Sequence, residues 1–211
     1  MYHKFIKRLV DVILSACGIV LLLPLWLILA IAIKIDEPGP VFFRQKRIAQ
    51  DKNGEKRFFR IYKYRSMKMC TPKDTPTHLL ENPEQYITKV CGFLRKTSLD
   101  ELPQIFNIFF GQMSIIGPRP ALWNQDDLYA QRAKYGANAV KPGLTGWAQI
   151  NGRDELPIDV KAKLDGEYVE KMSFVFDVKC FLGTITSVLK HEGVVEGGTG
   201  AMEKEKEEAK K

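Results

Sequence analysis

The stretch VILSACGIVLLLPLWLILAIAI (Val12–Ile33) contains no charged side chain. At about 1.5 Å per residue, a helix of this length is long enough to cross the ~30 Å hydrocarbon core of a bilayer. The apolar run is too long for a signal peptide, and Ile31–Lys34 (IAIK) is a poor small-residue cleavage site. The sequence therefore predicts a membrane-embedded segment near the N-terminus.

Two features bear on whether this segment spans the membrane or re-enters the leaflet it came from. Pro24 lies near its middle, where it removes a backbone donor and favours a sharp bend. Basic residues flank both ends of the segment, so the distribution of positive charge does not indicate which end faces the cytoplasm. An arrangement with both ends on the cytoplasmic side would account for this symmetry. The basic residues are Lys4, Lys7 and Arg8 before the segment and Lys34, Arg44, Lys46 and Arg47 after it. Because proline is tolerated in spanning helices, the residues alone leave both arrangements open.

Composition excludes several classes of protein. The chain has 211 residues, 45% of them hydrophobic, which excludes a disordered polymer, and one long apolar stretch excludes a polytopic membrane protein. The net charge of +7 indicates an anionic partner such as lipid head groups, phosphorylated substrates or nucleic acid. The four cysteines form no CxxC pair and only three histidines are present, so we expect free thiols and no structural zinc site.

Residue patterns after the apolar stretch predict an α+β, mostly helical domain that contains a short β-hairpin. Strands are expected at 41–44 and 57–64 with a turn at 51–54, followed by an irregular proline-rich loop at 70–83. Helices are expected at 83–94, 98–111, 121–135, 159–171 and 177–190, and residues 140–152 read as irregular. The chain thus divides into a membrane segment (1–35), a domain (36–190) and a charged C-terminal tail (191–211).

The block Asp100-Glu101-Leu102-Pro103-Gln104 has a structural and a chemical interpretation. Ser98 with Glu101 three residues later fits a capping box, and Asp100 could instead cap a helix that tolerates Pro103 in its first turn. Alternatively, a helix N-terminus would hold one carboxylate ionised for attack on phosphorus or for binding a divalent cation. The second carboxylate would assist the first.

Candidate anion-binding side chains surround this block in sequence. Prolines on both sides of Arg119 fix the backbone around its guanidinium, an arrangement that suits bidentate phosphate binding. The other candidates are Lys63, Arg65, Arg95 and Arg153. Each arginine taken alone is more simply a surface ion pair, but together they favour a phosphate site.

Three ordered blocks resemble the small monotopic phosphoglycosyl transferases, the bacterial sugar transferases that start glycoconjugate assembly. The blocks are FRIYKYRSM (Phe59–Met67), RKTSLDELPQIFNIFFGQMSIIGPRP (Arg95–Pro120) and KPGLTGWAQINGR (Lys141–Arg153). With the proline-containing N-terminal segment, the resemblance covers about residues 1–190.

The resemblance implies a membrane enzyme that transfers a sugar 1-phosphate from a UDP-sugar to a polyprenol phosphate, such as undecaprenyl phosphate, and releases UMP. Asp100 would be the nucleophile that forms a covalent phosphosugar intermediate, Glu101 would assist in proton or metal handling, and Mg²⁺ would bind at Asp100. Phosphate binding is implied for Lys63, Arg65, Arg95, Arg119 and Arg153. The membrane segment would re-enter one leaflet, bent at Pro24, on the cytoplasmic face of the bacterial inner membrane.

One departure from the family and two other functions remain to be tested. Some members have serine before the helix-breaking proline, where this chain has Leu23, whose side chain cannot satisfy the carbonyl that Pro24 frees. A glycosyl transferase would release UDP instead of UMP. A non-catalytic basic adaptor would bind anionic lipid or nucleic acid, although no nucleic-acid-binding motif is visible and no such partner is expected.

Overall fold

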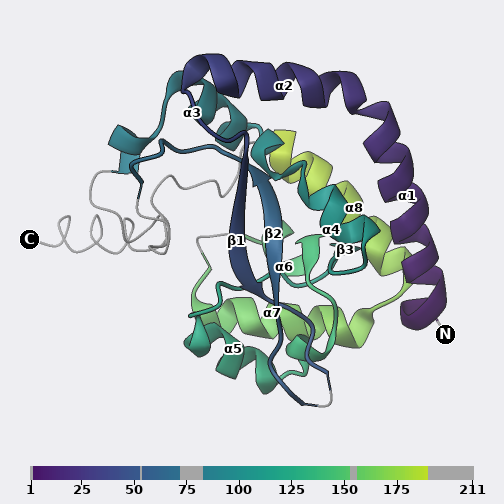
Figure 1. Cartoon of the computed structure of the whole chain (residues 1–211). Coiled ribbons are helices and arrows are strands. Elements are labelled where there is room, and N and C mark those ends of the chain that lie inside the picture. Colours follow the sequence, from purple (N-terminus) through teal and green to yellow (C-terminus); the bar gives the residue numbers. More distant parts are fainter. Residues whose placement is uncertain (1, 53, 72–82, 153–155, 190–211) are drawn as a thin grey trace, which may run out of the picture.

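The computed structural model describes residues 2–52, 54–71, 83–152 and 156–189. The described part is mostly helical with two small sheets, which confirms the predicted α+β, mostly helical composition (Figure 1). Its elements are η1 (Tyr2–Ile6), α1 (Lys7–Leu21), α2 (Leu23–Asp36), β1 (Phe42–Ile48), β2 (Phe58–Tyr64), η3 (Pro83–Tyr86), α3 (Lys89–Lys96), η4 (Leu99–Glu101), α4 (Gln104–Phe109), β3 (Ser114–Ile116), α5 (Asp126–Ala133), η5 (Ala137–Ala139), β4 (Gly143–Thr145), α6 (Trp147–Ile150), α7 (Ile158–Lys171) and α8 (Phe174–Leu189).

The N-terminal apolar segment forms two helices, α1 and α2, that meet at a 62° bend. Within the described ranges, no single helix has the length and apolarity of a membrane span, but this bent pair has both when taken together. The bend lies at Leu22, so Pro24 falls in the first turn of α2, where its missing N–H is not needed. The predicted bend is therefore present, while its placement in a membrane stays a prediction.

Helix α1 directs its polar side chains inward. Lys7, Asp11 and Ser15, spaced one turn apart, are all buried. Lys7 Nζ lies 2.5 Å from the carboxylate of Asp177 in α8, and Asp11 accepts a hydrogen bond from Ile115 N at 2.9 Å. The remaining surface of α1 is largely apolar and exposed, with Leu9, Ile13, Leu14, Val20 and Leu21.

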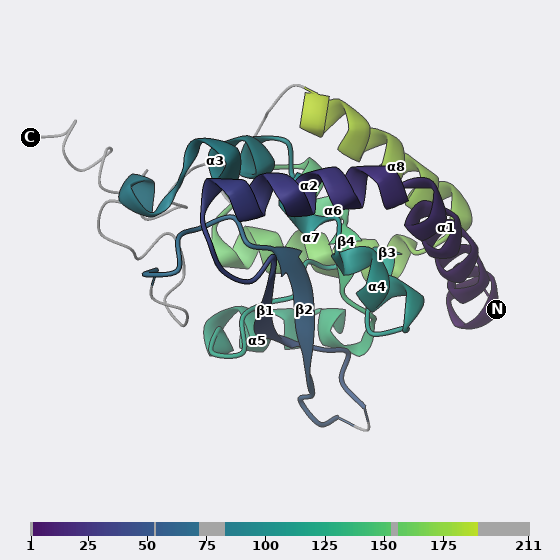
Figure 2. The same cartoon turned by 45° about the horizontal axis from the view of Figure 1, so that its top comes forward.

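Strands β1 and β2 form the predicted antiparallel hairpin, in a register that runs from Phe42 opposite Tyr64 to Ile48 opposite Phe58. The first strand extends four residues beyond its predicted end because its alternating side chains remain paired with β2. On the inner face, Phe59 and Ile61 pack against Ile108 and Met113. Figure 2 shows the hairpin projecting away from α2.

The predicted irregular region contains a second, parallel sheet of β3 and β4 that the sequence analysis missed. Its strands are three residues long, too short for a periodic pattern. The backbone approaches itself closely here, since a Cβ on Gly143 or Gly146 would lie 2.1 Å from backbone atoms of Gly117. Glycine at these positions thus allows the loop after β3 to pack directly on β4.

The other predicted helices are present at the expected positions, but some of them are shorter than predicted or divided in two. Helices α7 and α8 are confirmed, the helix predicted at 121–135 is shortened to α5, and the one at 83–94 divides into η3 and α3. Ile116, Tyr168 and Cys180 join β3, α7 and α8 in one buried cluster. All four cysteines are free, as expected. The predicted tail (191–211) and most of the proline-rich loop lie outside the described residues.

Candidate active site

Asp100 and Glu101 lie in the 3₁₀ turn η4, and α4 begins only at Gln104. Both capping interpretations are wrong. Ser98 has a left-handed backbone (φ 56°) and its side chain caps nothing, while Pro103 precedes α4 without a side-chain cap. The two carboxylates are therefore engaged by side chains from other elements, which removes the structural explanation for the acidic pair.

Glu101 is held by two cations. Lys63 Nζ donates to its Oε1 at 2.8 Å, and Arg119 donates from two nitrogens, at 3.1 Å to Oε2 and 2.5 Å to Oε1. Burial raises the pKa of Glu101, but Arg119 and Lys63 outweigh burial and hold that pKa well below its ordinary value. A carboxylate with both oxygens bonded to cations is a poor proton carrier, so the implied role of Glu101 in proton handling finds no support here.

Asp100 has a different environment. The carboxylate is 7% exposed and accepts a hydrogen bond at Oδ2 from Ser66 Oγ at 3.2 Å. Burial raises the pKa of Asp100, and the positive charge of Lys63 opposes that rise. The helix N-terminus expected at Asp100 is absent, because α4 starts only at Gln104, and burial is the largest influence on the pKa of this group.

The site is assembled from three separate parts of the chain. Lys63 comes from the last residues of β2, and Ser66 follows two residues after the strand ends. Arg119 comes from the loop after β3, which packs through Gly117 on β4 and is stiffened by Pro118 and Pro120. The hairpin, the acidic turn and this loop therefore meet at the two carboxylates.

The predicted phosphate-binding residues occupy different places. Lys63 and Arg119 contact Glu101, and Arg95, in the last turn of α3, lowers the pKa of Asp100 by its charge. Arg65 is buried, and its guanidinium donates to the carbonyls of Ile33, Glu37 and Pro38 at the end of α2. Its donors are therefore used to fasten α2 to β2. Arg153 lies outside the described residues.

Sequence reasoning missed two polar side chains near the acidic pair. Ser66 lies within the FRIYKYRSM block, but a serine after a strand has many ordinary explanations and gives no specific signal. Gln104 is 1% exposed, and within the described residues its Nε2 has no hydrogen-bond partner. Its place in the DELPQ block, next to the carboxylates, was the available signal.

The side chains around the two carboxylates show which of them could bind the expected Mg²⁺. No group of three or more His, Cys, Asp or Glu side chains that could hold a metal occurs within the described ranges. Mg²⁺ commonly uses one or two carboxylates together with water and substrate phosphates. Glu101 is engaged by cations, which leaves Asp100 as the carboxylate that fits such a site.

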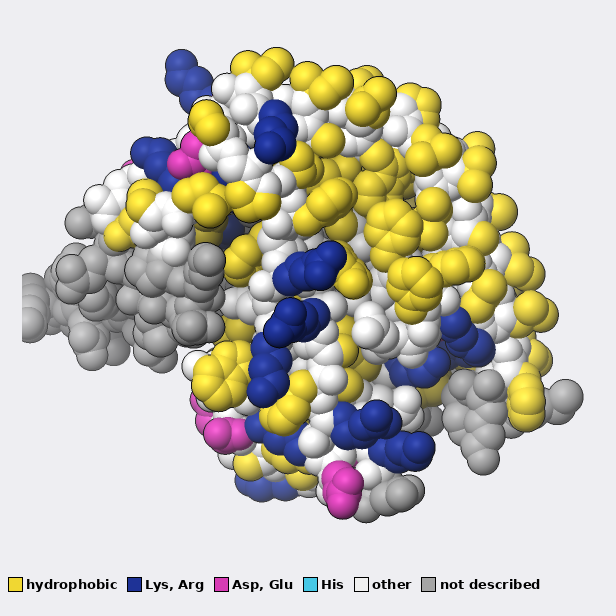
Figure 3. Space-filling view, viewed as in Figure 1, with side chains coloured by type: hydrophobic (Ala, Val, Ile, Leu, Met, Phe, Trp, Pro, Cys, Tyr) yellow, Lys and Arg dark blue, Asp and Glu magenta, His cyan; other side chains and the backbone are white. Residues whose placement is uncertain are grey.

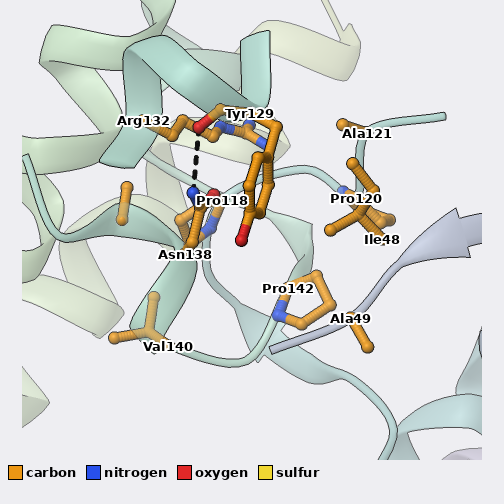
Figure 4. A pocket seen from close by; sticks show the side chains of 11 residues that line it. Ile48, Ala49, Pro118, Pro120, Ala121, Tyr129, Arg132, Asn138, Val140 and Pro142 are labelled. Carbon is orange, nitrogen blue, oxygen red and sulfur yellow. Dashed lines mark hydrogen bonds between the residues drawn. The ribbon is translucent and has the colours of Figure 1, made fainter. Parts of the chain in front are cut away.

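A small cavity lies behind the Arg119 loop (Figure 4). Its volume is about 20 Å³, and it is lined by Pro118, Pro120, Tyr129 and Asn138 among others. Asn138 Nδ2 donates to the carbonyl of Tyr129 at 2.9 Å across one wall. This space suits a water molecule and is too small for a nucleotide.

Comparison with known proteins agrees with this geometry. The family model described as "Bacterial sugar transferase" matches residues 2–191. The chain belongs to the bacterial sugar transferase family.

Several bacterial sugar transferases can be aligned over most of the chain. It is 38% identical over 190 residues to the UDP-glucose:undecaprenyl-phosphate glucose-1-phosphate transferase of Escherichia coli (strain K12). This alignment covers 87% of this chain and 40% of that protein. It is 38% identical to the uncharacterized sugar transferase EpsL of Bacillus subtilis (strain 168), over 90% of each chain. It is 32% identical to the exopolysaccharide production protein ExoY of Sinorhizobium fredii, in an alignment that covers 89% of this chain and 87% of that protein. The chain thus spans about two fifths of the Escherichia coli relative and nearly all of the two shorter ones.

Proposed function

We propose that this chain transfers a sugar 1-phosphate from a UDP-sugar to a polyprenol phosphate, in the first membrane step of glycoconjugate or exopolysaccharide assembly, and releases UMP. The observation that carries the proposal is the asymmetry of the acidic pair. Glu101 is fixed by Lys63 and Arg119, whereas Asp100 has one modest hydrogen bond, from Ser66. The printed names of the relatives, several of which are undecaprenyl-phosphate sugar phosphotransferases, support the same reaction class.

The reaction follows a two-step route through the enzyme. A carboxylate oxygen of Asp100 attacks the phosphorus that carries the sugar, and the bond from that phosphorus to the bridging oxygen breaks, so that UMP leaves. A phosphate oxygen of the polyprenol phosphate then attacks the same phosphorus and displaces Asp100. One phosphate site thus serves both substrates in turn, as covalent catalysis requires.

The neighbouring residues position charge. Glu101 holds Arg119 and Lys63 at the acidic turn, and their positive charge there favours the binding of a diphosphate. Arg95 adds positive charge near Asp100, which favours the ionised nucleophile against the cost of burial. Arg65 we assign to joining the end of α2 to the strand that carries Lys63.

Asp100 is also the residue that would hold Mg²⁺, together with the substrate phosphates. When bound, the ion offsets diphosphate charge and stabilises the leaving UMP.

We further propose that α1 and α2 re-enter one leaflet on the cytoplasmic face of the bacterial inner membrane. The bend between them, the exposed apolar faces of both helices and the inward polar face of α1 support this placement. It holds the acidic turn near the interface, where a lipid phosphate and a water-soluble nucleotide can both reach it. Tags on both termini should be shielded in intact cells and react only after permeabilisation. A tag that reacts from the periplasm would contradict re-entry.

The nucleotide product separates the proposal from its alternatives. The full chain, supplied with a polyprenol phosphate and a set of UDP-sugars, should release UMP with one of them, and Asp100→Asn should reduce this release about a thousandfold or more. Release of UDP would indicate a glycosyl transferase. Absence of turnover with every donor, together with salt-sensitive lipid binding, would indicate a basic adaptor.

A further inference from the structure

The hairpin of β1 and β2 has an outer face that the reaction does not use. Side chains alternate along each strand, so the inner face carries Phe59, Ile61 and Lys63 while the outer face turns away from the core. The outer face consists of Phe42, Arg44, Lys46, Phe58, Arg60 and Tyr62. We call these six residues the hairpin outer face.

The cations of the hairpin outer face are exposed, and two of them lie beside aromatic rings. Arg44 lies 4.9 Å from the centroid of the Tyr62 ring, and Lys46 lies 4.2 Å from that of Phe58. Arg60 is paired across the strands with Lys46, so that two like charges are neighbours. No carboxylate forms an ion pair with Arg44, Lys46 or Arg60 in the described parts of the chain. This uncompensated positive charge attracts an anionic surface.

One end of the hairpin outer face lies next to α2. Phe42 is 48% exposed and stacks on Tyr64 with ring centroids 5.4 Å apart. Tyr64 in turn contacts Trp26 of α2, at 6.0 Å between ring centroids. Figure 3 shows apolar side chains over α1 and α2 and a run of Lys and Arg side chains over the hairpin region next to them.

We propose that the hairpin outer face lies on the head groups of anionic lipids and is a second membrane contact beside α1 and α2. Aromatic rings interleaved with cations next to an apolar surface are typical of the membrane interface. A single-stranded nucleic acid fits less well, because bases stack on open ring faces and here cations already lie over Tyr62 and Phe58. The inference rests on the proposed membrane placement of α1 and α2.

Acetylation of lysines in the full chain, reconstituted in nanodiscs, tests the proposal. Discs of phosphatidylcholine alone are compared with discs that also contain phosphatidylglycerol, and a water-soluble acetylating reagent is followed by mass spectrometry. Lys46 should react several-fold more slowly in the phosphatidylglycerol discs, and added salt should restore its reactivity. Lys134, directly after α5, and Lys163, in α7, are exposed. Helices α5 and α7 lie on the opposite side of the molecule from α2 (Figure 1), so both lysines should react equally in both discs.

A pair of variants keeps Lys46 as the reporter. Arg44→Gln with Arg60→Gln should remove most of the phosphatidylglycerol-dependent protection of Lys46, because each charge removed weakens the attraction to an anionic surface about fivefold. Lys163→Gln with Lys171→Gln removes the same charge elsewhere and should leave the protection unchanged.

The outcomes are distinct. A chain that inserts into both discs with equal Lys46 reactivity would overturn the lipid contact alone. A chain that inserts into neither would overturn the membrane placement and the contact with it. Protection of Lys46 by a single-stranded oligonucleotide but not by phosphatidylglycerol would favour a nucleic-acid surface and overturn the proposal.

Discussion

Gly18 of α1 lies directly against Ile105 of α4, so closely that a Cβ on Gly18 would be 2.6 Å from Ile105 Cδ1. Helix α1 and the helix that follows the acidic pair are thereby packed closely together, with the Ile105 side chain lying directly over Gly18. Arg8 adds a second link, since it donates to the carbonyls of Ile108 and Phe109 at 2.7 and 2.8 Å, at the end of α4. The position of the N-terminal helices and the position of the acidic turn are therefore coupled.

Gly18→Ala should overpack this contact and lower the free energy of unfolding by about 1 kcal/mol, despite the better helix propensity of alanine. Ile105→Val removes the Cδ1 atom that the new methyl would meet. The double variant should therefore lose less stability than the two single variants added together, with a coupling of about 1 kcal/mol. Thermal unfolding of the four chains in detergent measures this cycle. Simple additivity would mean that the helices are not in contact in solution.

Arg8→Gln should loosen the end of α4. It removes a positive charge and charge-assisted hydrogen bonds from two terminal carbonyls, which together are worth about 1–2 kcal/mol. Leu9→Gln is the matched control, because the neighbouring Leu9 is 60% exposed on the outer face of α1. In detergent, Arg8→Gln should accelerate amide hydrogen exchange in α4 and Leu9→Gln should not. Equal exchange in both variants would contradict the link.

Glu101→Gln should destabilise the chain and leave two cations without their counter-charge. The expected loss is about 2–3 kcal/mol, below the ~3–5 kcal/mol of a fully buried pair, because the Arg119 side chain remains 36% exposed. The lowered pKa of Glu101 means that its stabilisation is present above pH 4.5 and is lost as the pH falls through the folded-state pKa. The stability difference between wild type and Glu101→Gln should therefore shrink below pH 4.5. A pH-independent difference would show that the charge of Glu101 is not responsible.

Thiol modification should distinguish two of the cysteines. Cys70 is exposed, whereas Cys180 is buried, and burial together with Asp177 raises the pKa of Cys180 to about 11. At pH 8 only about one part in a thousand of such a thiol is the reactive thiolate. A thiol reagent should thus label Cys70 rapidly and Cys180 only after denaturation. Rapid labelling of Cys180 in the folded chain would contradict the packing of α8.

Local patterns predicted the elements whose residues carry their own signal. The apolar stretch with Pro24, the alternating strand around Ile61 and the last two helices all depend on local chemistry, and all are present. The parallel pair of β3 and β4 escaped prediction because it depends on Gly117, Gly143 and Gly146 meeting across a long separation in sequence.

The candidate site was predicted only in part, for the same reason. The residue types indicated Asp100, Glu101, Lys63 and Arg119 as site residues. No local sequence pattern indicates that Lys63 and Arg119 both form ion pairs with Glu101. Nor does the sequence indicate that Arg65 fastens α2 instead of facing the carboxylates. The partners of these side chains depend on which elements pack together, and that packing is known only from the three-dimensional structure.

Mass spectrometry of the wild-type chain, incubated with its UDP-sugar in the absence of polyprenol phosphate and then digested, would locate the bond to phosphorus. We expect a phosphosugar on the peptide that contains Asp100, formed together with UMP, lost on addition of polyprenol phosphate and absent from Asp100→Asn. Release of UMP by the wild type with no adduct on Asp100, or with an adduct on another side chain, would contradict the proposed mechanism.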